Sequence, residues 1–156
     1  MVVAAVLAAV LAVSATGFYV FIYTLWLKRT SRQNIVIGGA AGAMPVLVGW
    51  AAVTNSLGWA PVLLFLMIFW WTPPHFWALA IRYADDYRAA GVPMLPALVP
   101  PRVAVRHMVA YTVVLVANSL VLVPVGHLGW TYSLAAAVLG LLFLVGVVDL
   151  GRAPPA

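Results

Sequence analysis

Five long apolar stretches, joined by short links, constrain this chain more than any other feature of its sequence. They cover about residues 2–27, 35–53, 59–81, 107–126 and 130–150. A helix needs about 20 apolar residues to cross the hydrocarbon core of a bilayer. The sequence therefore predicts an all-α, polytopic membrane bundle with about five spans. The composition agrees, because only 7% of the 156 residues are charged, whereas soluble domains have about 25%.

Basic residues occupy only alternate links of this pattern. With five spans, all eight Lys and Arg residues fall on one side of the bilayer, namely Lys28, Arg29, Arg32, Arg82, Arg88, Arg102, Arg106 and Arg152. Short basic loops stay in the cytoplasm, so we expect a multi-pass protein of the cell (inner) membrane with these links cytoplasmic. They are too few and too interrupted to bind nucleic acid. Met1 then lies outside without a charge, which suggests that the chain begins partway through a longer protein.

The long link at about residues 82–106 contains Asp85 and Asp86, two of the three acids in the chain. Adjacent carboxylates repel each other, so the pair needs compensating cations. Arg82 and Arg88 could supply them. Mg²⁺ could do so as well, since it is typically held by one or two carboxylates together with substrate phosphates. A solvated acidic pair is the alternative that the residues alone leave open.

Tyr23, Lys28 and Arg29 close the first span at the same face of the membrane. Basic groups at this position could hold a phosphate group, or they could serve only to set the topology. The chain has no Cys, which excludes disulfides and Cys-ligated metals. It also contains no GxSxG, P-loop or HExxH motif, so soluble hydrolase and nucleotidase functions have no support.

His75 follows Pro73 and Pro74 inside the third span. The prolines predict a kink or break in this helix. An ionisable residue at membrane depth is a functional candidate, and His75 could bind a carboxylate, transfer a proton, ligate a metal or make a structural hydrogen bond. A small transporter could also use a broken span, but it would need a second one, and only Pro124 is available.

Other residues are more simply explained by packing. Gly38 and Gly42 form a GxxxG pair, which predicts close approach of helices. Asn118 is predicted to link two helices by a hydrogen bond. Most Trp residues lie near span ends, as in an aromatic belt, and His107 and His127 are expected at the interface.

Four motifs together resemble the protoheme IX farnesyltransferase (haem O synthase) family, within the UbiA-type intramembrane prenyltransferase superfamily. They are the runs at residues 23–29, 33–50, 71–80 and 85–96. Their order and consistent spacing make the resemblance specific over about residues 19–96. The remaining spans are similar to the family only in their hydrophobic pattern.

The resemblance implies a nine-helix bundle in which these five spans are the fourth to the eighth. It implies transfer of a farnesyl group from farnesyl diphosphate to a vinyl group of haem B, giving haem O. It also implies Mg²⁺ held by two Asp-rich motifs, the second of which matches Asp85 and Asp86. Catalytic roles then fall to Asp85, Asp86 and Lys28, and substrate contacts to Tyr23, Arg29, His75, Arg82 and Tyr87.

The first Asp-rich motif of the family would lie before the first span. The resemblance therefore implies an N-terminal half of the bundle as a partner, besides the lipid bilayer and the two substrates. Haem A synthase, which would take up haem O, is a further expected partner. The alternative is a non-catalytic membrane fragment or assembly partner that is inactive alone.

Overall fold

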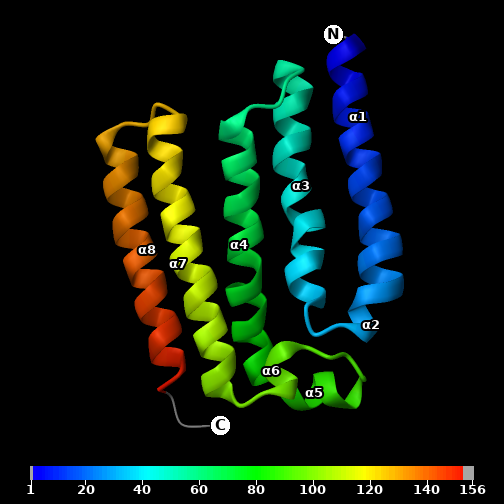
Figure 1. Cartoon of the computed structure of the whole chain (residues 1–156), viewed down its shortest axis with the longest axis vertical. Coiled ribbons are helices and arrows are strands. Elements are labelled where there is room, and N and C mark those ends of the chain that lie inside the picture. The colour runs from blue at the N-terminus through cyan, green and yellow to red at the C-terminus, as the bar shows by residue number, and fades with distance from the viewer. Residues whose placement is uncertain (1, 153–156) are drawn as a thin grey trace.

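The computed structural model describes residues 2–152, with side chains from Val6 onward. All regular structure in this part of the chain is helical (Figure 1). As expected, five helical segments are long and apolar enough to cross a membrane. The first combines α1, η1 and α2, and the bounds are α1 (Val2–Gly17), η1 (Phe18–Leu27), α2 (Lys28–Thr30), α3 (Asn34–Thr54), α4 (Trp59–Arg82), α7 (Pro101–Val125) and α8 (Trp130–Leu150).

The five spans stand side by side in one row, in chain order from α1 to α8 (Figure 1). Each span packs mainly on its neighbours in the sequence, and successive spans are antiparallel. Lipid is as apolar as these side chains, so close packing and interhelical hydrogen bonds hold such helices together. Asn118 provides one of these bonds, because its Nδ2 donates to the carbonyl oxygen of Leu63 in α4 at 2.9 Å. The predicted link is confirmed.

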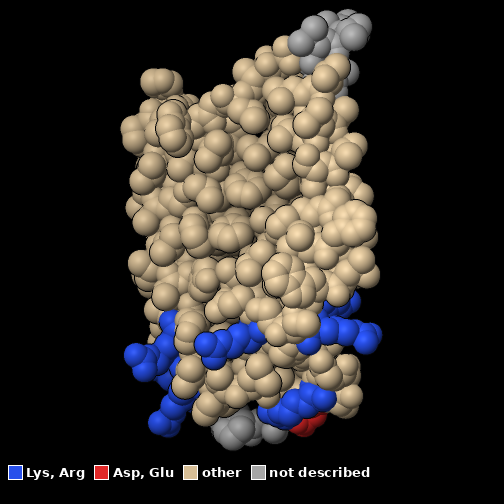
Figure 2. All heavy atoms as spheres, turned by 45° about the vertical axis from the view of Figure 1, so that its right-hand side comes forward, with Lys and Arg blue, Asp and Glu red and all other residues tan. Residues whose placement is uncertain are grey.

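The basic residues gather where the helices end on one side of the membrane (Figure 2). The antiparallel spans bring the turn at residues 31–33, the link between α4 and α7, and the end of α8 to this same end. We call it the basic end. Its longest link is not an open loop, because it contains α5 (Ala84–Ala89) and α6 (Leu95–Leu98). Helix α7 then begins at Pro101, where proline suits the first helical position.

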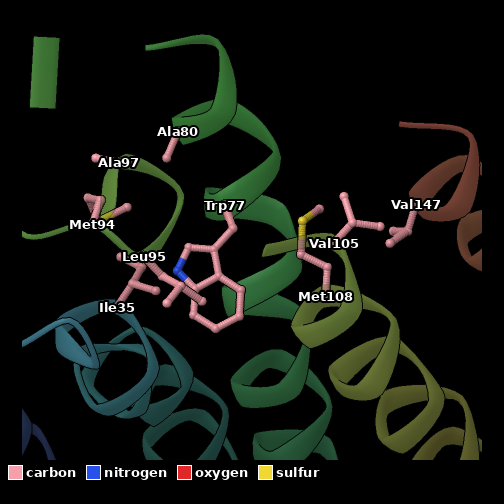
Figure 3. Close-up of a cluster of buried hydrophobic side chains, with 9 residues drawn as sticks. All are labelled: Ile35, Trp77, Ala80, Met94, Leu95, Ala97, Val105, Met108 and Val147. Atoms are coloured by element: carbon pink, nitrogen blue, oxygen red, sulfur yellow. The ribbon is translucent and has the colours of Figure 1, made fainter. Parts of the chain in front are cut away.

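A cluster of buried side chains joins several helices near the basic end (Figure 3). The indole of Trp77 is 1% exposed and lies between Ile35 of α3, Leu95 of α6 and Met108 of α7. This Trp therefore belongs to the core, unlike the interfacial position expected for most Trp residues. Because α6 contributes to the cluster, the link that carries the acidic pair is anchored to the spans. The cluster consists of Ile35, Trp77, Ala80, Met94, Leu95, Ala97, Val105, Met108 and Val147.

Helix α4 runs without a break through Pro73 and Pro74. The prediction was a kink or a break, and a break is wrong. Each proline removes one backbone hydrogen bond, but both prolines are buried. Packing of neighbouring helices around proline makes it tolerable in membrane spans. The transporter interpretation loses the broken span on which it depended.

The first span widens into a π-helix at η1. The N–H of Lys28 donates to the carbonyl oxygen of Tyr23, and the hydroxyl of Thr24 donates to that of Tyr19 at 2.9 Å. Both bonds join residues five apart, as in a π-helix. Such helices are rare and often occur at functional sites. Lys28 therefore lies about one wide turn beyond Tyr23, on the same side of the span.

Candidate functional site

The basic segment of the site is held by the turn that leads into α3. Lys28 and Arg29 lie on α2 with exposed side chains. Asn34, the first residue of α3, is 1% exposed, and its Nδ2 donates to the carbonyl oxygen of Lys28 at 3.3 Å. Asn34 thus joins the end of the first span to the second. Sequence reasoning did not single out this residue, although an amide directly after a basic link was a usable signal.

The acidic pair opens helix α5. The side chain of Asp85 is 95% exposed and forms an ion pair with Arg88. Arg88 also donates through Nε to the carbonyl oxygen of Ala97 at 2.9 Å, which fastens α5 to α6. Arg82 instead lies over the ring of Tyr83, 5.8 Å from its centroid. Of the two arginines expected to compensate the acids, only Arg88 does so.

Asp85 and Asp86 are adjacent in the sequence and offer a pair of carboxylates to a metal ion at this end of the bundle. Within residues 2–152, no third His, Asp or Glu side chain joins them to complete a metal site. Both acids are exposed and therefore free to take up further ligands. Two hard oxygen donors with space for phosphate and water fit Mg²⁺, which rarely occupies an all-protein cage.

The basic and acidic segments lie at the same end. No Cα atom of α2 lies within 8 Å of one in α5, and among the described residues no ion pair joins Lys28 or Arg29 to the two acids. Tyr87 is half-buried against the core cluster. A ligand with several charged oxygens could bridge the two segments.

An apolar groove of about 760 Å³ lies between the first span, α3 and α4. Its volume is within the usual range of small-molecule sites. Tyr23 and Ile35 line it near the basic end, and Ala12 and Val48 line it further into the membrane. The groove therefore begins beside the basic segment and extends along the apolar part of the bundle.

Two glycines of α3 shape this groove by close packing. A Cβ atom on Gly38 would lie 2.6 Å from Cε2 of Tyr23, and one on Gly39 would lie 3.1 Å from Cβ of Thr72. A Cβ on Gly42 would meet nothing within 4 Å, and Gly42 lines the groove. The close approach expected from the GxxxG pair thus occurs at Gly38 and its neighbour, not at Gly42.

His75 lies in an aromatic stack on α4. Its ring is 4.2 Å from that of Trp71 at an interplanar angle of 17°, and Phe76 meets it edge-on at 5.2 Å. Trp71 and Phe76 line the apolar groove, so His75 lies beside its wall. Among the described residues no side-chain hydrogen bond involves this imidazole, which leaves its nitrogen atoms available to a ligand.

Apolar spans with a groove between them and charged segments at one end are the features of a membrane-embedded bundle. The chain belongs to the UbiA prenyltransferase family, whose sequence profile matches residues 1–154.

Three similar proteins carry a more specific name. The chain is 60% identical over 147 residues to the protoheme IX farnesyltransferase of Gloeobacter violaceus, covering 94% of the chain and 48% of the relative. It is 58% identical to that of Frankia alni, covering 87% and 47%, and 54% identical to that of Cutibacterium acnes, covering 94% and 43%. The chain thus spans about half the length of these relatives. No solved structure was found to match it.

Proposed function

We propose that this chain takes part in the transfer of a farnesyl group from farnesyl diphosphate to a vinyl group of haem B, which yields haem O. The observation that carries the proposal is the apolar groove that ends beside the basic segment, in a chain 60% identical to a protein named protoheme IX farnesyltransferase. An isoprenoid chain suits the groove, and a diphosphate suits its charged end.

The proposal assigns the farnesyl chain to the groove and its diphosphate to the basic end. Tyr23 lines the groove and lies about one turn before Lys28. A substrate lying along this wall would thus place its first carbon near Tyr23 and its phosphates near Lys28 and Arg29. Arginine and lysine bind phosphate oxygens through charge-assisted hydrogen bonds.

Asp85 and Asp86 would hold Mg²⁺ on the opposite side of the diphosphate. When bound, the metal would neutralise charge on the phosphate oxygens. The pair would need a bridging ligand to act together with Lys28, because α5 and α2 are not in contact. Arg82 and Tyr87, on either side of the acids, would contact the same substrate.

The chemistry follows from charge and from exclusion of water. As the allylic C–O bond breaks, Lys28 and Arg29 would stabilise the negative charge on the departing diphosphate. The farnesyl carbon then forms a bond with the terminal carbon of the vinyl group. Water adds to the other vinyl carbon and releases a proton, so the products are haem O and diphosphate. The apolar walls would keep water from the allylic carbon before the vinyl group reaches it.

His75 is assigned to the haem side of the site. Its ring and that of Trp71 form a flat aromatic pair, a surface on which a planar macrocycle could stack. The multi-pass protein would lie in the cell membrane with its basic end in the cytoplasm, following the positive-inside rule. Haem A synthase would be the acceptor of the product.

A binding measurement tests the assignment of the basic segment. The chain is placed in lipid nanodiscs and titrated calorimetrically with farnesyl diphosphate, with and without Mg²⁺. We expect Mg²⁺-dependent binding that Lys28→Gln weakens at least about tenfold, because a hydrogen bond to a charged group contributes about 1.5–3 kcal/mol. Arg32→Gln, in the same link, is the matched control. Equal effects of the two substitutions, or equal affinity for farnesyl diphosphate with and without Mg²⁺, would contradict the proposal.

A further inference from the structure

A second groove, of about 430 Å³, lies between the beginning of α7 and the end of α8. Three arginines line it together with apolar residues, and its full lining is Arg102, Val105, Arg106, Val109, Val148, Gly151 and Arg152. Helix α8 has no contact with α2 or α5 and lies at the other end of the row from α2 (Figure 1). This arginine groove is thus separate from the candidate prenyl-transfer site.

Helix geometry brings the three arginines to the same groove. Arg102 and Arg106 are four residues apart and therefore lie on the same face of α7. Helix α8 approaches this face closely at its end, since a Cβ atom on Gly151 would lie 2.9 Å from Cγ1 of Val105. Arg152 follows directly. A glycine contact thus places the last arginine beside the first two.

The groove keeps a net positive charge. Asp149 pairs with Arg152 at 3.3 Å, and the two side chains are 60% and 77% exposed. An ion pair this exposed is weak, so Arg152 can exchange the carboxylate for another anion. Three positive charges and one negative charge leave a net charge of two. The N-terminus of α7 adds partial positive charge.

Apolar surface continues from the arginines toward the middle of the membrane. Val109 and Val148 line the groove itself. One turn further along the same helix faces, Val113 is 51% and Val145 is 47% exposed. A free phosphate ion would use only the arginines, whereas a phospholipid would use both the arginines and this apolar surface.

We propose that the arginine groove binds an anionic phospholipid, with its phosphate on Arg102, Arg106 and Arg152 and its acyl chains along α7 and α8. Basic pockets between spans on the cytoplasmic side are suited to anionic headgroups. The site is independent of farnesyl transfer, and its occupant is set by the combination of charge and adjoining apolar surface.

Native mass spectrometry of the full chain in detergent tests this site. Phosphatidylglycerol and phosphatidylcholine are titrated in parallel, and the fraction of protein that retains lipid is measured. We expect preferential retention of phosphatidylglycerol. Arg106→Gln should weaken it about fivefold, the equivalent of about 1 kcal/mol for one arginine near the surface. Arg32→Gln, which removes the same charge elsewhere at the basic end, should leave it unchanged.

Three results would overturn the proposal. They are equal retention of the two lipids, equal weakening by Arg32→Gln and Arg106→Gln, and displacement of phosphatidylglycerol by an equal concentration of inorganic phosphate. The last result would assign the groove to a free phosphate ion. If Arg106→Gln does not fold, Arg102→Gln provides the same test on the same face of α7.

Discussion

Gly38 of α3 lies so close to the ring of Tyr23 that a Cβ atom on it would come within 2.6 Å of Cε2. The ring lies against the bare backbone of α3 at the wall of the apolar groove. Tyr23 is also the residue whose carbonyl oxygen receives the N–H of Lys28 across the π-helical turn. The absence of a side chain at Gly38 therefore lets the Tyr23 ring pack against α3 at the wall of the groove.

The substitution Gly38→Ala should displace the Tyr23 ring. We expect a loss of about 1–3 kcal/mol in stability, as for other overpacked sites, and weaker binding of farnesyl diphosphate. The thermal midpoint in detergent and calorimetric titration measure the two effects. Gly49→Ala in the same helix is the control, because a Cβ there meets nothing within 4 Å. Similar behaviour of the two variants would show that the close contact has no role.

Asn34 should matter for the position of Lys28. Replacing Asn34 with Ala removes its hydrogen bond to the Lys28 carbonyl oxygen, which should release α2 from the start of α3. We expect faster hydrogen exchange at residues 28–33 and a loss of about 1 kcal/mol in stability. Gln33→Ala serves as the control, since that side chain is exposed. Unchanged exchange in Asn34→Ala would refute the positioning role.

The spans could be predicted from sequence because hydropathy and length decide whether a helix crosses a membrane. The interhelical bond of Asn118 could be predicted for a similar reason, since a polar amide in an apolar span needs a partner. The unbroken course of α4 through Pro73 and Pro74 could not, because it depends on how tightly the neighbouring helices enclose both prolines.

In the candidate site, too, some features could be predicted from the sequence and others depend on packing. The sequence indicated which residue types carry charge at the basic end, and the structure places them there. It could not indicate that η1 is a π-helix, because no local pattern distinguishes i→i+5 from i→i+4 hydrogen bonds. It also could not show that Trp77 is buried, since that depends on α6 folding back onto the spans.

The orientation in the membrane can be tested by labelling, because the chain contains no Cys. Single substitutions Ser56→Cys and Ala89→Cys place thiols at exposed positions. The two positions lie on links at opposite ends of the spans. With the basic end in the cytoplasm, an impermeant thiol reagent added outside whole cells should label position 56 and spare position 89. Labelling of position 89 alone would show that the basic end faces the outside of the cell.

The isolated 156-residue chain should not form haem O. Asp85 and Asp86 supply two carboxylates, and within residues 2–152 no further His, Asp or Glu joins them, so we expect too little positive charge at the site to stabilise the departing diphosphate. Its single row of spans also leaves the groove accessible to water, which would turn any allylic cation into farnesol. Purified chain is incubated with haem B, farnesyl diphosphate and Mg²⁺, and the products are separated by chromatography. Clear formation of haem O would contradict this expectation.

Haem O formation by the assembled protein is the most direct test of the proposed function. The chain is co-expressed with the N-terminal half of the Gloeobacter violaceus relative, and haem O is quantified for the native chain, Asp85→Asn and Asp149→Asn. Asp149, on α8, is the third acid of the chain. Asp149→Asn is therefore a control that removes the same charge as Asp85→Asn. We predict a loss of at least about 100-fold for Asp85→Asn, as for other groups that stabilise developing charge, and near-native product for Asp149→Asn. Near-native haem O from Asp85→Asn, at equal expression, would contradict the account.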